Sequence, residues 1–81
     1  MLGVLTKTAE KQYLKLPKKT QLLCDKQIDF LLENYRHSSL NSKKYDKSIG
    51  LWQARIDKFY RFYFLIQEDK YIIVSIKKHP K

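Results

Sequence analysis

Three basic side chains near the end of the chain have the types needed to bind and act on a phosphate: Arg55, Arg61 and His79. An arginine guanidinium is planar and donates two parallel hydrogen bonds to one phosphate group. A histidine titrates near neutral pH, so it can accept or donate a proton during a reaction. These three residues are our candidates for catalysis, and they predict chemistry at a phosphate.

Further polar side chains have the types that bind the rest of such a substrate. The candidates are Lys43, Lys44, Tyr45, Gln53, Tyr63 and Lys77. A tyrosine can stack on a nucleobase or donate a hydrogen bond, and a glutamine can bind a phosphate or sugar oxygen. The two neighbouring lysines lie in a polar segment, 36–50, which has no clear periodicity and which we interpret as a loop. They either reach over the basic site or are simply solvated.

Apolar and polar residues alternate with period two in three runs, 51–57, 60–67 and 71–77. Period two is the signature of half-buried strands, and the short breaks between the runs indicate an antiparallel meander. Successive side chains of a strand point to opposite faces of the sheet. The residues expected on the buried face all have even numbers: Trp52, Ala54, Ile56, Phe62, Phe64, Ile66, Ile72, Val74 and Ile76.

The hairpin loops fix how the three strands align. If the even-numbered residues share one face, each loop must contain an odd number of residues. The first loop is then 57–59 or 58–60, and the second is 68–70. The register that follows pairs Phe64 with Val74.

The odd-numbered face carries the basic residues. In this register Tyr63 lies opposite Ser75, and Arg61 lies opposite Lys77. Arg55 falls beside either Arg61 or Tyr63 on the neighbouring strand. Because like charges directly opposite one another destabilise a sheet, such a cluster predicts an anion that the chain itself does not supply. Phosphate is the obvious candidate.

The first half of the chain shows one strand pattern and two helical patterns. Residues 2–6 are a short apolar segment that we expect to be an edge strand, and Thr6 or Thr8 can cap the helix that follows. Apolar residues then recur with helical spacing up to residue 16 and again over 18–35. Pro17 separates the two helices, since it cannot continue the first and can occupy position N1 of the second. The predicted fold class is α+β: an N-terminal strand, a two-helix hairpin and a three-stranded antiparallel meander in one sheet, with the helices packed on one face.

Length and charge limit the function classes. At 81 residues the chain is expected to be one domain, 1–81, with a single modest core. Its net charge is +9 and its pI is about 9.7, so it should attract polyanions, of which nucleic acid is the commonest. A ribosomal protein, a DNA-binding module, a ribonuclease and a membrane-surface protein all share this signal.

Cysteine and histidine usage points to a site without metal. The lone Cys24 cannot form an internal disulfide, and neither a signal peptide nor a run of 18 apolar residues is visible. A reducing cytoplasm is the expected location. His37 and His79 with one cysteine do not make a zinc set, and there is no glycine-rich phosphate loop. We expect no metal and no cofactor.

Four short stretches, in this order and with these gaps, resemble the RelE/ParE superfamily of bacterial and archaeal toxins. They are Lys-Leu-Pro-Lys-Lys at 15–19, Gly-Leu-Trp-Gln-Ala-Arg-Ile at 50–56, Tyr-Arg-Phe-Tyr-Phe at 60–64 and Ile-Lys-Lys-His-Pro at 76–80. The resemblance covers nearly the whole chain and favours the RelE-like branch. It implies the toxin of a type II toxin–antitoxin system, held inactive by a cognate antitoxin.

The RelE-like branch implies an mRNA endonuclease, or mRNA interferase, that inhibits translation and has no membrane partner. Such toxins cut mRNA in the ribosome A site, without a metal, by attack of the ribose 2′-hydroxyl on the adjacent phosphate. By this resemblance Arg61 is the phosphate-binding strand arginine and Arg55 the basic residue of the preceding strand. His79 is similar to the C-terminal histidine that some members use in proton transfer. The reaction needs a base, an acid and fixed positive charge, which these residue types supply.

The resemblance does not identify the general base. Some relatives have a glutamate in the loop before the first meander strand, where this sequence has Asn41, Ser42, Lys43 and Lys44. A deprotonated lysine, Lys43 or Lys44, can fill the role, and so can His79. Two other function classes stay open: a ParE-like inhibitor of DNA gyrase that cleaves nothing, and a basic RNA-binding module without catalysis.

Overall fold

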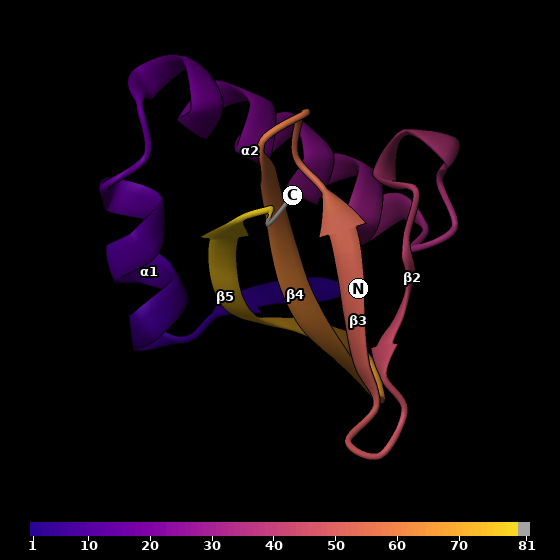
Figure 1. Ribbon diagram of the computed structural model, residues 1–81. Coiled ribbons are helices and arrows are strands. Elements are labelled where there is room, and N and C mark those ends of the chain that lie inside the picture. The colour runs from indigo at the N-terminus through magenta and orange to yellow at the C-terminus, as the bar shows by residue number, and fades with distance from the viewer. Residues whose placement is uncertain (80–81) are drawn as a thin grey trace.

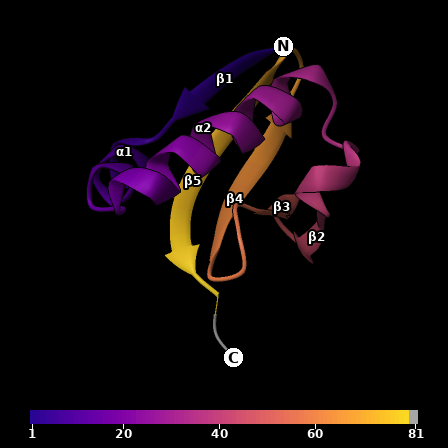
Figure 2. The ribbon, with the colours of Figure 1, turned by 90° about the horizontal axis from the view of Figure 1, so that it is seen from above.

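Over the residues that the structure describes, 1–79, five strands form one sheet and two α-helices cover one of its faces (Figure 1, Figure 2). This is a computed structural model. In chain order the elements are β1 (Leu2–Leu5), α1 (Lys7–Leu14), α2 (Lys18–Glu33), the 3₁₀ turn η1 (Ser38–Leu40), β2 (Lys43–Asp46), β3 (Leu51–Arg55), β4 (Tyr60–Gln67) and β5 (Lys70–Lys78). The order across the sheet is β1-β5-β4-β3-β2. The predicted α+β class is confirmed.

The predicted meander is present, because β3, β4 and β5 pair antiparallel in sequence order. Beyond the last pair of β3 and β4, the N–H of Ile56 donates to the carbonyl of Tyr60 at 3.0 Å, so the loop is 57–59. The Asp57 carboxylate accepts hydrogen bonds from the N–H groups of Phe59 and Tyr60 at 2.8 and 2.9 Å. An aspartate whose carboxylate binds backbone N–H groups two or three residues later is typical of a turn. Of the two predicted loops, 57–59 is therefore the one that forms.

The second hairpin loop differs from the predicted 68–70. Gln67 pairs with Lys70, so the turn consists of Glu68 and Asp69 alone. Glu68 has a φ of 44°, a left-handed conformation that two-residue hairpin turns require. The prediction was wrong because it assumed an unbroken period of two along both strands.

A β-bulge between Tyr63 and Phe64 compensates for the even-numbered loop. Phe64 consequently pairs with Ile73 and not with Val74. The even-number rule is therefore wrong for the first half of β5, where Tyr71 and Ile73 are the buried residues. Beyond the bulge the predicted register holds.

Segment 36–50 is not a loop throughout, as the sequence had indicated. It contains η1 and then β2, which pairs antiparallel with β3 through Lys43 opposite Gln53 and Lys44 opposite Trp52. The strand has polar residues on both faces, so no apolar alternation marks it. Its partner is the edge of β3, and pairing with that edge overrides a weak local propensity.

Both helices begin at the residues that the sequence singled out. The Thr6 hydroxyl oxygen accepts a hydrogen bond from the Ala9 N–H at 3.1 Å and so caps α1, one of the two predicted caps. Pro17 is the N-cap of α2 and not its first residue, because its ψ of 147° is not helical although its carbonyl accepts a bond from Gln21 at 2.9 Å. The helix ends at Glu33, two residues before the predicted end, since the next residue has an extended backbone.

The helices α1 and α2 pack closely on one side of the sheet. Gly3 of β1 lets α2 approach, since a Cβ there would meet Leu32 at 3.0 Å. At the edge of β5, the Gln12 side chain of α1 accepts a hydrogen bond from the Ile76 N–H at 2.7 Å. The largest fully buried side chains are Phe62, Phe64, Leu31, Leu40, Ile73 and Cys24. Figure 2 shows α2 crossing the sheet on this side, so the candidate site lies on the opposite face.

Candidate functional site

Three cations lie directly opposite one another on the open face of the sheet. Arg55 of β3 pairs with Arg61 of β4, and Arg61 pairs with Lys77 of β5. Each has at least one neighbour in sequence that is buried in the core under the helices, so the three side chains point the other way; these neighbours are Ala54, Ile56, Phe62 and Ile76. Directly opposite Cα atoms of antiparallel strands are about 4.5–5.5 Å apart, which concentrates the charge in one small area. We call Arg55, Arg61 and Lys77 the cationic row. The sequence predicted the pairing of Arg61 with Lys77, and it left Arg55 beside either Arg61 or Tyr63; in the structure the partner is Arg61.

The guanidinium of Arg61 is held by the β3–β4 turn. Its Nη1 donates to the carbonyl oxygens of Asp57 at 2.5 Å and Tyr60 at 2.9 Å. A guanidinium has five N–H donors, and these contacts use the two on Nη1. Among residues 1–79, Nε and Nη2 make no hydrogen bond, so the edge that they form is left for a ligand. The Asp57 carboxylate accepts hydrogen bonds from two backbone N–H groups of the turn through Oδ1.

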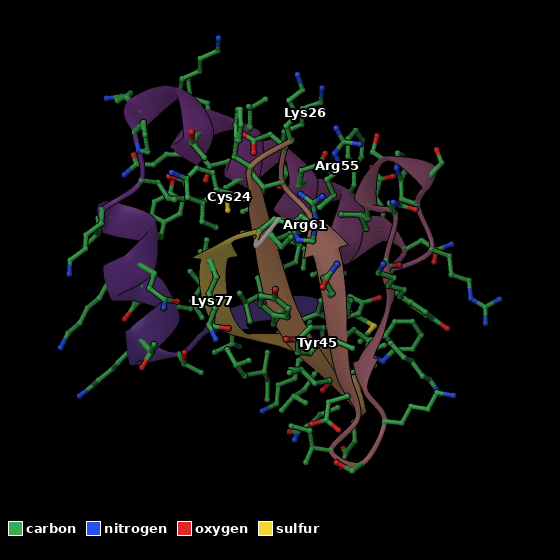
Figure 3. All side chains as sticks on the ribbon, viewed as in Figure 1. Cys24, Lys26, Tyr45, Arg55, Arg61 and Lys77 are labelled. Atoms are coloured by element: carbon green, nitrogen blue, oxygen red, sulfur yellow. The ribbon has the colours of Figure 1, made fainter. Side chains whose placement is uncertain are left out.

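Tyr63 lies in the middle of the open face beneath two other side chains. It is only 5% exposed, although it is not part of the core cluster. Tyr45 packs edge-on against it with ring centroids 4.9 Å apart, and the Nζ of Lys77 lies 5.8 Å from the ring centroid. Figure 3 shows Tyr45, Arg61 and Lys77 around this part of the sheet. Burial and then Tyr45 raise the pKa of Tyr63 while Arg61 lowers it, with a net rise, so the hydroxyl stays a neutral donor.

The open face continues from Tyr63 towards β2. Tyr63 pairs with Gln53, and Gln53 pairs with Lys43. Paired residues point to the same face, so both lie next to the cationic row. Gln53 is 6% exposed and Lys43 is exposed. The structure thus brings five of the six predicted binding residues together on one face: Lys43, Tyr45, Gln53, Tyr63 and Lys77.

Lys44 does not join this group. It pairs with Trp52 on the helix side of the sheet, and its Nζ lies 5.7 Å from the Trp52 ring. Successive residues of a strand alternate between faces, so Lys44 faces away from the side shared by Lys43 and Tyr45. The sequence could not show this because β2 was not recognised as a strand.

Lys26 is a cation near the site that the sequence did not indicate. It comes from α2, and Figure 3 shows it at the same end of the molecule as Arg55. The next residue, Gln27, is buried and donates to the carbonyl of Arg55 at 2.7 Å, which ties this turn of α2 to the end of β3. No sequence signal marks Lys26, since its position depends on how the helix crosses the sheet.

His79 is fixed at the same end of the sheet through its backbone. Its N–H donates to the carbonyl of Phe59 in the β3–β4 turn at 2.6 Å, and its side chain is exposed. The turn that holds Arg61 therefore also positions the histidine backbone. Pro80, the last residue of the quoted motif, lies outside the described residues.

The structure of residues 1–79 also bears on a metal site, a reactive cysteine and a membrane-spanning helix. In residues 1–79, no three His, Cys, Asp or Glu side chains are placed to hold a metal ion. Burial, and then Asp25, raise the pKa of the Cys24 thiol to about 12. This buried cysteine is protonated at neutral pH and is not a nucleophile. In the same range, no helix is long and apolar enough to span a membrane.

Comparison with known proteins finds matches by structure but not by sequence. No protein-family model matches the chain, and no curated protein sequence matches it. Solved structures do match. A chain of the archaeal RelE–RelB complex from Pyrococcus horikoshii has a TM-score of 0.81 and 18% identity, over 95% of this chain and 92% of that chain. The isolated E. coli RelE toxin has a TM-score of 0.78 and 16% identity, over 99% of this chain and 85% of that chain. A chain of the YoeB–YefM complex from Staphylococcus aureus has a TM-score of 0.77 and 17% identity, over 99% of both chains.

The architecture and the open basic face define a class of small α+β protein, in which a helical hairpin covers one side of a sheet and cations gather on the other. Within that class, the chain has the fold of the RelE/ParE toxin superfamily. The resemblance found in the sequence is confirmed at this level. Identities of 16–18% establish the shared fold, and the reaction has to be argued from the residues of this chain.

Proposed function

We propose that this protein is the toxin of a toxin–antitoxin pair and acts in the cytoplasm as a ribosome-dependent mRNA endonuclease. The observation that carries the proposal is the cationic row, in which Arg55, Arg61 and Lys77 lie directly opposite one another. Like charges in this arrangement oppose folding, so they are expected to serve a bound anion. The resemblance to RelE-like mRNA interferases, together with the fold shared with the isolated E. coli RelE toxin, supports a phosphodiester of mRNA as that anion.

Arg61 is the proposed ligand of the scissile phosphate. Its free Nε and Nη2 edge can donate two parallel hydrogen bonds to one phosphate. The two turn carbonyls hold the guanidinium before substrate arrives, so little reorganisation is needed when charge develops on the phosphorane. Arg55 and Lys77, on the two flanking strands, add positive charge on either side of it.

Proton transfer is assigned to His79. Attack by the 2′-hydroxyl needs a base, and departure of the 5′-oxygen needs an acid. The neutral imidazole of His79 would take the proton from the 2′-hydroxyl, and the ammonium of Lys43 or Lys77 would give a proton to the departing 5′-oxygen. Neutral Tyr63 can donate a hydrogen bond to a phosphate oxygen, and Gln53 can bind a sugar oxygen. Tyr45, which is 61% exposed, can stack on the neighbouring base.

The partner is proposed to be a cognate antitoxin that covers the open face. On the same face, separated from the cationic row by the pair of Gln53 and Tyr63, four apolar residues pair across four strands: Val4, Ile72, Leu65 and Leu51. Val4 is 43% exposed, and the other three are half-buried. An extended segment with apolar side chains over this strip and acidic side chains over the cations would occlude the site. The matched structures from P. horikoshii and S. aureus are themselves toxin–antitoxin complexes.

The test is a primer-extension map of transcripts, made with the purified protein in the presence and absence of ribosomes. We expect cleavage that depends on ribosomes and falls about 10²–10³-fold in Arg61→Lys, which keeps the charge but loses the planar fork. Lys47→Gln, in the turn at the other end of β3, is the control and should cleave normally. Intact mRNA together with arrested DNA replication in expressing cells would overturn the proposal in favour of gyrase inhibition.

A further inference from the structure

A pocket on the helix side of the sheet has a lining that the proposed cleavage site does not use. It has a volume of about 480 Å³ and lies between the end of α2, the segment before β2, and β3. Its walls include Tyr35, Arg36, His37, Asn41, Ser42 and Trp52. Such a volume is within the usual range of small-molecule sites.

Two aromatic rings form one wall of this pocket. Tyr35 and Trp52 meet edge-on, with centroids 5.1 Å apart. Trp52 is half-buried and not fully enclosed, so part of an indole ring is available to a ligand. Aromatic side chains of this kind are the platforms on which single-stranded nucleic acids stack their bases.

The charges around the pocket are positive. The guanidinium of Arg36 lies 5.3 Å from the Tyr35 ring, and its Nε donates to the Tyr35 hydroxyl at 3.1 Å. The Nζ of Lys44 lies 5.7 Å from the centroid of the Trp52 ring. No residue of the lining is acidic. An aromatic wall with two cations suits a base carrying a phosphate, and it does not favour a basic or purely apolar peptide.

Hydrogen bonds hold the segment that forms the rest of the pocket. The Ser42 hydroxyl donates to the carbonyl of Tyr35, and the Ser39 N–H donates to Nδ1 of His37 at 3.1 Å. Because Nδ1 accepts, the neutral imidazole carries its proton on Nε2 and can donate from there. Asn41 ends η1 with a left-handed backbone of φ 47°, a conformation that asparagine adopts more readily than most residues, and its N–H donates to the Ser38 carbonyl at 3.3 Å. The pocket is therefore formed before a ligand binds.

We propose that this pocket binds one nucleotide of a single-stranded RNA, with the base against Trp52 and Tyr35 and a phosphate near Arg36 and Lys44. The inference rests on the proposed RNA substrate and extends it to a second point of contact. β2 connects the two places, since Lys43 faces the cleavage site and the adjacent Lys44 faces the pocket. A strand of RNA passing around the β2 edge would thus be held on both sides of the sheet.

Trp52 is the only tryptophan in the chain, so its fluorescence reports on this pocket directly. The probe is adenosine monophosphate, and ribose 5-phosphate, which has the phosphate but no base, is the matched control. We expect saturable quenching by the nucleotide and none by the sugar phosphate. Arg36→Ala should weaken the nucleotide affinity about fivefold, the effect of losing one cation at an aromatic site. Lys19→Ala, an equal change in charge at the other end of α2, should leave it unchanged.

The two proposals fail separately. Arg61→Gln should abolish mRNA cleavage while nucleotide quenching of Trp52 persists. If the wild-type protein shows no quenching, or equal quenching by ribose 5-phosphate, or the same affinity after Arg36→Ala, the pocket does not bind a base. Each of these results would leave the cleavage data untouched, because the readout does not depend on RNA being cut.

Discussion

Replacing Arg55 by glutamine should stabilise the folded protein while weakening its response to anions. Arg55 is exposed, and its direct partner across the sheet is another arginine, Arg61. Glutamine keeps most of the aliphatic part, one methylene group shorter, and a polar end, but it removes the charge. The substitution therefore tests whether the cationic row is a cost to folding that a bound anion offsets.

The magnitude follows from the register of the two strands. Like charges directly opposite in a sheet cost about 0.2–1 kcal/mol, and we take about 0.5 kcal/mol because Arg55 is exposed. For a domain of this size, 1 kcal/mol corresponds to about 4–8 °C in Tm, so the gain is about 2–4 °C. An anion at ten times its Kd stabilises the wild-type protein by about 1.4 kcal/mol. The variant should gain much less from the same anion.

The assay is thermal unfolding at low ionic strength, with and without a phosphate compound. Lys47→Gln removes the same charge from the turn before β3, away from the cationic row, and serves as the control. In about 1 M NaCl the Debye length falls to about 3 Å, so the difference between Arg55→Gln and the wild type should disappear. Urea titrations under the same conditions check that the gain is a change in the free energy of unfolding.

Two results would refute the reasoning. If Arg55→Gln and Lys47→Gln raise Tm equally, the effect is one of total charge and the pairing with Arg61 is irrelevant. If Arg55→Gln lowers Tm at low salt, the row is not repulsive in the folded protein. An anion that stabilises the wild type and the variant equally would place the binding site elsewhere.

Three further predictions concern stability, each measured by urea unfolding. Thr6→Val removes the hydroxyl that caps α1 at Ala9 and donates to the Val74 carbonyl at 3.0 Å, so the free energy of unfolding should fall by about 1–2 kcal/mol. Glu68→Gly relieves a left-handed backbone with φ 44° and should raise it by about 0.5–1 kcal/mol. Burial raises the pKa of the Cys24 thiol from 9.0 to about 12. The unfolded chain loses that proton first, so stability should fall by up to about 1.4 kcal/mol per pH unit between pH 9 and 12. Cys24→Ala should remove this slope.

Each of these three has a clear contrary outcome. An unchanged midpoint in Thr6→Val would mean that the cap contributes nothing to α1. A less stable Glu68→Gly would show that the flexibility gained by the unfolded chain outweighs the relief at the turn. A pH slope that survives in Cys24→Ala would have to come from other groups, among them Tyr13, whose hydrogen bond to Asp25 also raises its pKa to about 12.

Much of the site was predictable because its geometry is local. Arg61 and Lys77 lie opposite each other as the sequence indicated, since period-two alternation fixes the face and a short hairpin fixes the register. For Arg55 the sequence left two partners open, Arg61 and Tyr63, and the loop 57–59 found in the structure selects Arg61. The catalytic and binding roles of these residues remain predictions, because a shared face does not by itself define a reaction.

The sequence by itself determined the periods of the strands and helices, the helix junction at Pro17 and the excess of positive charge. Only the tertiary structure decided the bulge at Tyr63 and Phe64, the strand β2 and the pocket beside Trp52. The physical reason is that periodicity is set by neighbouring residues, whereas a bulge or an edge pairing depends on hydrogen bonds to a strand elsewhere in the chain. Residues 43–46 have no apolar alternation, and they become a strand because β3 offers its edge.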